Sequence, residues 1–133
     1  MECVFCQIVS KEESADIIYE DNLCLAFPDR HPQTRGHMQL IPKKHYQWVY
    51  EMPDMDKLFS TAQRIIHAII PVLGADHVTL ATFGHQIRHA HIWIVPQYTK
   101  IVQVRESLNG RKTAEGSIDL AGILREAIVK EVS

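Results

Sequence analysis

The chain has 133 residues, a length typical of a single domain, and 46% of them are apolar, so a sizeable core can be buried. Its formal net charge of -2 gives no overall basic field to recruit nucleic acid, so nucleic acid is not an expected partner and any phosphate site must be local. The sequence contains no apolar run of about 18 residues, so no membrane span is expected.

The N-terminal segment carries neither a basic stretch nor a long apolar run, so it is not expected to be a secretion signal. A reducing, cytoplasmic location follows as the expectation. In that location the three cysteines should be thiols or metal ligands rather than disulfides. Cys24 lies in an apolar run and is predicted to be buried.

The first half of the chain predicts three strands. Residues 17–19 and 23–27 have strand character and are separated by a polar turn at 20–22. Two prolines and a glycine mark a loop at 28–36. A third strand is predicted at 37–41, where Pro42 ends it.

The second half predicts a helix, two strands and a further helix. Residues 54–73 form the clearest helix, with Asp54 as the N-cap, Gly74 as the C-terminal stop and strain expected at Pro71. Strands are predicted at 78–83 and 89–95, a loop at 100–117, and a C-terminal helix from residue 120. The main helix has an apolar stripe that comprises Leu58, Ala62, Ile65, Ile66 and Ile69. We therefore expect one α+β domain over residues 1–133, with an antiparallel sheet of about five strands, one main helix and a C-terminal helix.

Two histidines stand at His89-Ala90-His91, in the last predicted strand. Alternate side chains of a strand share one face, so His89, His91 and Trp93 should point the same way. Two imidazoles on one rigid face suit metal binding or nucleophilic chemistry. The alternative is a pair of exposed surface histidines.

The segment Cys3-Val4-Phe5-Cys6 is a CxxC motif. A thioredoxin-like redox pair would lie between a strand and a helix of a βαβ unit, and no strand is predicted before this motif. Zinc is the better interpretation, because two thiolates at this spacing can occupy two corners of a tetrahedron. The alternative is two ordinary cysteines packed beneath a short N-terminal segment.

Three segments together resemble the histidine triad (HIT) superfamily: Ala26-Phe27-Pro28-Asp29 followed by Pro32 and Gly36-His37, then Ile41-Pro42-Lys43-Lys44-His45, then His89-x-His91. The likeness covers roughly residues 3 to 96. It implies an antiparallel α+β fold that usually dimerises and holds a nucleotide in a cleft. In this superfamily the middle histidine of H-x-H-x-H is the nucleophile, which is His91 here, and it forms a nucleotidyl-histidine intermediate. A backbone carbonyl near His89 usually fixes the other ring nitrogen.

The resemblance also implies nucleotide contacts. Asp29 corresponds to the acidic residue that holds the ribose hydroxyls, and Phe27 to an apolar wall of the base pocket, although Phe27 can equally be a core residue. The segment 84–88 corresponds to the loop that approaches the phosphate. Gln86 stands where a small hydroxyl residue is frequent, and it is a phosphate contact by position.

Zinc-bearing members of the superfamily pair a CxxC with two histidines. The matching positions are Cys3, Cys6, His45 and His89, with His37 as the alternative third ligand. One zinc ion there would tie the N-terminus to the strand that carries His91.

The chain departs from the superfamily at Trp93, which replaces the third histidine. An indole offers one N–H and cannot shuttle a proton. The nucleophile His91 remains, so the resemblance still implies a nucleotidyl hydrolase or transferase acting on a nucleotidyl conjugate. The alternatives are a zinc-stabilised nucleotide-binding module with little turnover, and a CxxC redox or nucleic-acid protein, against which the acidic balance counts.

Overall fold

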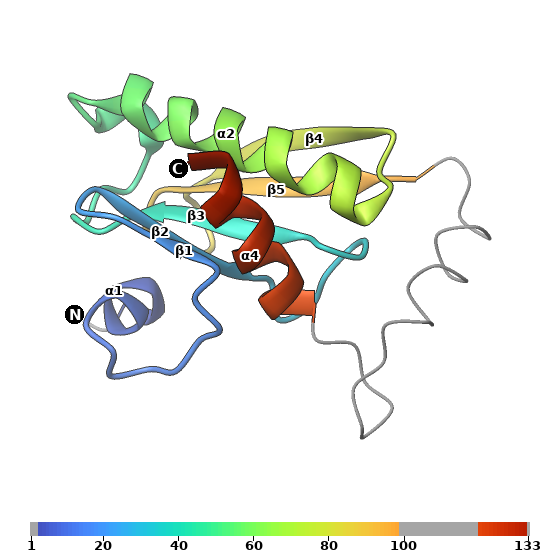
Figure 1. The fold of residues 1–133 in the computed structure, drawn as a ribbon. Helices are drawn as coiled ribbons and strands as arrows, with labels where there is room; N and C mark the ends of the chain where they lie inside the picture. Colours follow the sequence, from blue (N-terminus) through green and yellow to red (C-terminus); the bar gives the residue numbers. More distant parts are fainter. Residues whose placement is uncertain (1–2, 99–119, 133) are drawn as a thin grey trace.

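The structure, a computed structural model, describes residues 3–98 and 120–132 (Figure 1). The loop expected at 100–117 lies outside these residues. The elements follow the order α1 Val4–Val9, β1 Tyr19–Glu20, β2 Cys24–Pro28, β3 Met38–Pro42, the 3-10 turn η1 Val49–Glu51, α2 Met55–Leu73, β4 His77–Phe83, β5 His91–Gln97 and α4 Leu120–Val132.

A five-stranded antiparallel sheet forms the centre of the fold, in the order β1-β2-β3-β5-β4 (Figure 1). This arrangement, with α2 and α4 beside it, confirms the predicted α+β architecture. β5 has a strand on both sides, so the segment that carries His91 is held rigidly, whereas β4 lies at an edge.

The last strand begins at His91, so the prediction that it begins at residue 89 is wrong by two residues. The residues before it bond to the end of β3 and to the segment after β3 instead of to β4. The backbone N–H of Ala90 donates to the Tyr46 carbonyl at 2.6 Å, and the His89 ring bonds to the Pro42 carbonyl at 2.8 Å. The first strand likewise begins at Tyr19, two residues later than predicted.

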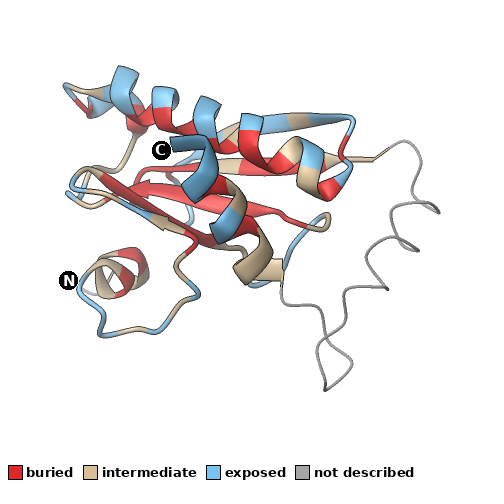
Figure 2. Ribbon diagram, in the orientation of Figure 1, coloured by how far each residue is buried: buried red, intermediate tan, exposed pale blue. Residues whose placement is uncertain are grey.

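The helices α2 and α4 cover one face of the sheet (Figure 2). The buried side of α2 packs with Leu40, Ile92 and Ile94 of the sheet and with Leu124 and Ile128 of α4. The stripe predicted for α2 is confirmed, with Ile66 at its half-buried margin and with these residues fully or nearly fully buried: Leu58, Ala62, Ile65 and Ile69.

The ends of α2 agree with the prediction in position and differ in detail. Asp54 is the N-cap residue, but its side chain makes no capping hydrogen bond. Gly74 ends the helix in the left-handed region, at φ 70°, where a residue without a Cβ is favoured. Pro71 lies inside the helix, which continues to Leu73.

The short helix α1 was not predicted. Its residues Phe5 and Ile8 are buried against Leu25, Phe27 and Ile41, which lie on the sheet face opposite α2 and α4. This packing holds the CxxC segment against the sheet.

Cys24 is fully buried, as predicted. Within the described residues, each helix is too short or too polar to cross a lipid bilayer.

Candidate functional site

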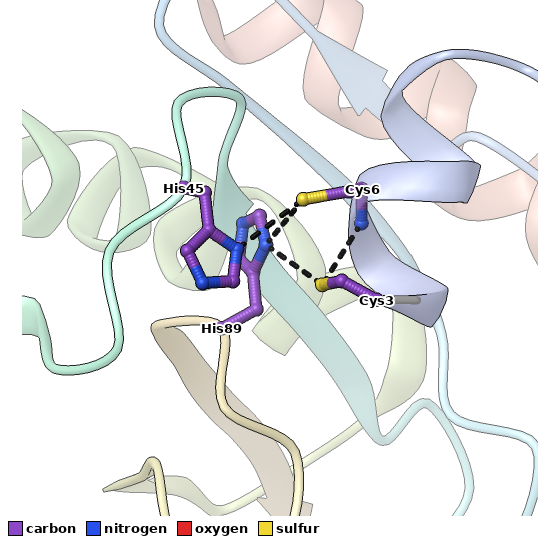
Figure 3. Close-up of side chains that lie close together, drawn as sticks. All are labelled: Cys3, Cys6, His45 and His89. Carbon is purple, nitrogen blue, oxygen red and sulfur yellow. Dashed lines mark hydrogen bonds between the residues drawn. The ribbon is translucent and has the colours of Figure 1, made fainter. Parts of the chain in front are cut away.

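Four metal-binding side chains meet at one end of the sheet (Figure 3). Cys3 and Cys6 come from the N-cap and first turn of α1, His45 from the segment after β3, and His89 from the segment before β5. Their ligand atoms all lie within 4.8 Å of one another, and Figure 3 shows the four side chains turned toward a common centre. These are the residues that the resemblance implied as zinc ligands.

Three sulfur–nitrogen distances in this cluster match the edges of a zinc tetrahedron. With Zn–S and Zn–N bonds of about 2.3 Å and 2.0 Å, a sulfur and a nitrogen on the same zinc lie about 3.5 Å apart. The Cys3 Sγ lies 3.4 Å from the His89 Nδ1, and the Cys6 Sγ lies 3.2 Å from the His45 Nδ1 and 3.5 Å from the His89 Nδ1. The residues present therefore fit a four-coordinate zinc ion.

His89 is held in the form that a metal requires. Its Nε2–H donates to the Pro42 carbonyl at 2.8 Å, which leaves the lone pair of Nδ1 directed at the two sulfurs. Burial lowers the pKa of His89 to about 4, helped by His45 and opposed by the hydrogen bond to Pro42. The ring is therefore neutral near pH 7.

The Cys6 thiol is protonated near pH 7 unless a cation lies beside it. Partial burial, followed by the neighbouring Cys3 side chain, raises the pKa of Cys6 to about 11 when the protein groups act alone. A bound metal reverses this effect, because a coordinating thiol is deprotonated. The cluster therefore has the character of a metal site rather than of a reactive thiolate pair.

His91 opens β5 and is 4% exposed. Its Nδ1–H donates to the backbone carbonyl of His89 at 2.7 Å, so the lone pair lies on Nε2. Burial is the main cause that lowers the pKa of His91, although the same hydrogen bond and Asp29 partly offset it. A neutral, oriented imidazole of this kind can act as a nucleophile.

His91 lines a pocket of about 320 Å³, a size suited to a small ligand. A larger pocket of about 560 Å³ lies between the 28–37 segment and the start of α4; it shares Asp29 and does not include His91. The smaller pocket is the one that contains the oriented imidazole of His91. It is lined by Asp29, Gln39, Phe83, His85, Gln86, Ile87, His91 and Trp93.

Asp29 presents a fixed carboxylate to this pocket, with a side chain that is 15% exposed. Its Oδ1 accepts from the backbone N–H of His31 at 2.8 Å, and its Oδ2 accepts from the Gln39 Nε2 at 2.6 Å. His37, the alternative zinc ligand, lies beside Asp29 and not in the metal cluster, with its Nε2 3.6 Å from the Asp29 Oδ2.

Trp93 lies on the same face of β5 as His91, as the strand period predicts. Its ring packs edge-on against His37 and Phe83, with ring centroids 4.7 Å and 5.0 Å away. The indole therefore forms one side of the pocket, and its ring contacts lie away from the Cys/His cluster.

Phe27 and Gln86 occupy different surroundings. Phe27 is 5% exposed, packs against Phe5 at 5.4 Å between ring centroids, and is not among the residues that line the His91 pocket. It pairs in register with Gln39, so it lies next to that pocket. Gln86 is exposed and lines the pocket directly.

The 84–88 turn is held in place by the segment after β3. The Gln47 Nε2 donates to the Gly84 carbonyl at 3.0 Å. A Cβ at Gly84 would lie 2.5 Å from the Gln47 carbonyl oxygen and 2.8 Å from the Trp48 ring, so only glycine allows this approach.

Two pocket residues were not anticipated from the sequence, Gln39 and Phe83. Gln39 carried a signal: it is the one polar residue in the apolar segment of β3, and it is 6% exposed. Phe83 carried none, because an aromatic residue at the end of a strand is ordinary.

A family model described as HIT domain matches residues 10–100. A HIT-like protein from Methanocaldococcus jannaschii is 33% identical over 134 residues, which cover 93% of this chain and 97% of that protein. Adenylylsulfatase HINT3 from Arabidopsis thaliana is 36% identical over 103 residues. The matched region covers 72% of this chain and 52% of that protein. The structure of a Zn-bound histidine triad family protein from Mycobacterium smegmatis is similar, with a TM-score of 0.75 and 32% identity over 98% of this chain and 95% of that one.

Proposed function

Because this chain belongs to the histidine triad (HIT) family, whose members bind nucleotides and include hydrolases, we propose that it is a nucleotidyl hydrolase or transferase with His91 as the nucleophile. The observation that carries the proposal is the orientation of His91. Its Nδ1–H is committed to the His89 carbonyl at 2.7 Å, which leaves the Nε2 lone pair available for a phosphorus atom in the pocket.

The proposed reaction has two displacement steps. In the first, the Nε2 lone pair of His91 forms a bond to the α-phosphorus, and the bond from phosphorus to the leaving group breaks with its electron pair on the leaving group. In the second, water attacks the same phosphorus and releases a proton to the solvent, the N–P bond breaks with its electron pair returning to the His91 Nε2, and a nucleoside monophosphate leaves. The His89 carbonyl stabilises the positive charge that develops on the imidazole.

The pocket supports a nucleotide as the substrate. In this proposal Asp29 accepts hydrogen bonds from the ribose, and Phe27 borders the base. Gln86 and the 84–88 turn contact the phosphate. The Trp93 indole N–H contacts a departing or phosphate oxygen. We infer a preference for leaving groups that depart without a proton, since Trp93 cannot donate one catalytically. Adenylyl sulfate is a suitable substrate to test, because the related HINT3 is named an adenylylsulfatase.

We also propose that the Cys/His cluster holds zinc with a structural role. The ion would supply a cross-link between α1 and the segment before β5. His89 then has two tasks: its ring binds the metal and its backbone carbonyl orients His91.

Paired variants test this division of roles. His91→Ala should abolish turnover of adenylyl sulfate and leave the fold and the zinc content unchanged. His89→Ala should lower the zinc content and the melting temperature. Mass spectrometry of rapidly quenched wild-type protein should detect an adenylyl adduct that His91→Ala lacks. Parallel losses of activity and stability in the two variants would contradict the assignment.

The second candidate function is a nucleotide-binding module with little turnover. Trp93 supports it, because the indole stands where an imidazole would assist the leaving group. Micromolar binding of AMP without an adduct or product from any adenylylated substrate would favour this alternative.

We propose that the protein forms a homodimer through β4 and α2. β4 is an edge strand that carries Leu80, which is 44% exposed, and α2 exposes Phe59 beside it. Light scattering after size exclusion should give twice the chain mass, and Leu80→Lys should shift it toward the monomer.

A further inference from the structure

The pocket contains a feature that the proposed reaction does not use. Two buried side-chain polar atoms lack a hydrogen-bond partner within the described ranges, the His37 Nε2 and the Gln39 Oε1. Both side chains lie beside Asp29, and they are 2% and 6% exposed. Buried polar atoms without partners are costly and uncommon, so a pair of them around one carboxylate calls for a physical reason.

The protonation state of His37 follows from its contacts. The backbone N–H of Gln33 donates to the His37 Nδ1 at 3.0 Å, so Nδ1 carries no proton and Nε2 carries one. That N–H faces the Asp29 Oδ2 at 3.6 Å. Burial lowers the pKa of His37, which keeps the ring neutral.

The orientation of the Gln39 amide follows in the same way. A carboxylate can only accept hydrogen bonds, so the amide atom 2.6 Å from the Asp29 Oδ2 is the nitrogen. The carbonyl oxygen, Oε1, is therefore an acceptor with no donor, on a side chain that lines the pocket with His91 and Trp93.

The Asp29 carboxylate still has room for a hydrogen-bond donor. Its Oδ2 accepts from Gln39 and faces the His37 N–H, whereas its Oδ1 accepts, from the part of the chain that the structure describes, only the His31 backbone N–H at 2.8 Å. Two acceptors, the Asp29 Oδ1 and the Gln39 Oε1, therefore remain for donors from a ligand.

We propose that Gln39 is a sugar-specificity residue: its Oε1 accepts a hydrogen bond from one hydroxyl of a ribose, while Asp29, held by Gln39 and His37, accepts from the other. The inference rests on the proposed nucleotide function and deepens it. A vicinal diol supplies two O–H donors on adjacent carbons, which matches two acceptors on side chains that are hydrogen-bonded to each other. A deoxyribose leaves one buried acceptor without a donor.

The first experiment uses the wild-type protein. Dissociation constants are measured by calorimetry for AMP, for its 2′-deoxy and 3′-deoxy forms, and for the matching 2′-fluoro and 3′-fluoro forms. Fluorine replaces the hydroxyl in size but cannot donate a hydrogen bond. We expect the deoxy and the fluoro forms to bind about three- to tenfold more weakly at the position that meets Gln39.

The second experiment compares Gln39→Leu with Gln86→Leu, a matched loss of an amide from the same pocket. In Gln39→Leu one of the two deoxy forms should bind as tightly as AMP, so the loss of affinity caused by removing that hydroxyl disappears. The zinc content and the circular dichroism should stay as in the wild type. In Gln86→Leu the loss of affinity caused by removing either hydroxyl should stay as in the wild type.

Each outcome decides between the two claims. If AMP binds and Gln39→Leu keeps both wild-type penalties, the role of Gln39 is refuted and the proposed function stands. If Gln39→Leu does not fold, the wild-type series decides, because fluoro forms that bind as tightly as AMP show that neither hydroxyl donates. If the wild-type protein binds no nucleotide, both claims fail.

Discussion

Replacing Trp93 with histidine would restore an imidazole beside the nucleophile. Residues two apart on a strand have Cα atoms about 6.6 Å apart, so a side chain at this position reaches the leaving-group side of a phosphorus bound at His91. The present ring packs against His37 at 4.7 Å and Phe83 at 5.0 Å, and an imidazole is smaller than that indole, so it fits the same space. A general acid typically contributes about 10²–10⁴-fold to a rate. Trp93→His should therefore raise kcat/KM for phosphoramidates with amine leaving groups by about 10²-fold or more.

The assay is a series of adenylylated substrates whose leaving groups differ in pKa, from amines to sulfate. Sulfate departs as an anion and needs no proton, so its kcat/KM should change little. The plot of log kcat/KM against leaving-group pKa should be steep in the wild type and flatter in Trp93→His. Trp93→Phe is the matched control: it also shrinks the ring and adds no proton donor, so it should leave the slope unchanged.

Two results would refute this reasoning. A change by the same factor for every leaving group in Trp93→His would show an effect on binding or packing alone. A flatter slope in Trp93→Phe would show that the space, and not the proton, is responsible.

Three further predictions follow from the site. Chelation of the metal should lower the melting temperature by about 20 °C or more, since structural zinc contributes on the order of 10 kcal/mol to such sites and each kcal/mol shifts the midpoint of a domain of this size by at least about 2 °C. Cys6→Ser should also lower the melting temperature, and an unchanged thermal transition after verified metal loss would argue against a structural ion. Asp29→Ala should weaken AMP about ten- to hundredfold and should weaken one of its two deoxy forms, 2′ or 3′, less, as titration calorimetry would show; equal weakening of AMP and of both deoxy forms would remove the ribose contact. Burial holds the pKa of His91 below its ordinary value of about 6.5. The kcat/KM for adenylyl sulfate should therefore be flat above about pH 6.5 and fall at lower pH, because protonation removes the lone pair of the nucleophile. A fall that begins above pH 7 would contradict a neutral His91.

Local sequence patterns predicted the elements that have a clear period. The stripe from Leu58 to Ile69 predicted α2, and the alternation around His91 and Trp93 predicted the face of β5. The start of β5 was predicted two residues too early, because His89 continues the alternating pattern of the strand. In the structure its ring is instead hydrogen-bonded to the Pro42 carbonyl. That partner is remote in sequence, so no local pattern reveals it.

The metal ligands and the pocket differed in how far they could be predicted. The CxxC motif indicated a zinc site by its residue types, and the resemblance to zinc-bearing HIT proteins added His45 and His89 as the partners that the structure brings beside it. The helix α1 that carries the cysteines was missed, because VFCQIV is short and rich in residues with strand propensity. The contacts of Asp29 with His37 and Gln39 were missed as well. They depend on a turn in which the backbone N–H of Asp29 donates to the His37 carbonyl, and this turn brings the carboxylate back to β3.

The Cys/His cluster also constrains the order in which the chain can fold. Cys3 and His89 are 86 positions apart, and closing so long a loop has a high entropic cost until the intervening strands have paired. During synthesis the cysteines leave the ribosome before His45, and His89 follows last. If the cluster holds zinc as proposed, binding by all four side chains is therefore a late event that requires the chain to have been made as far as residue 89.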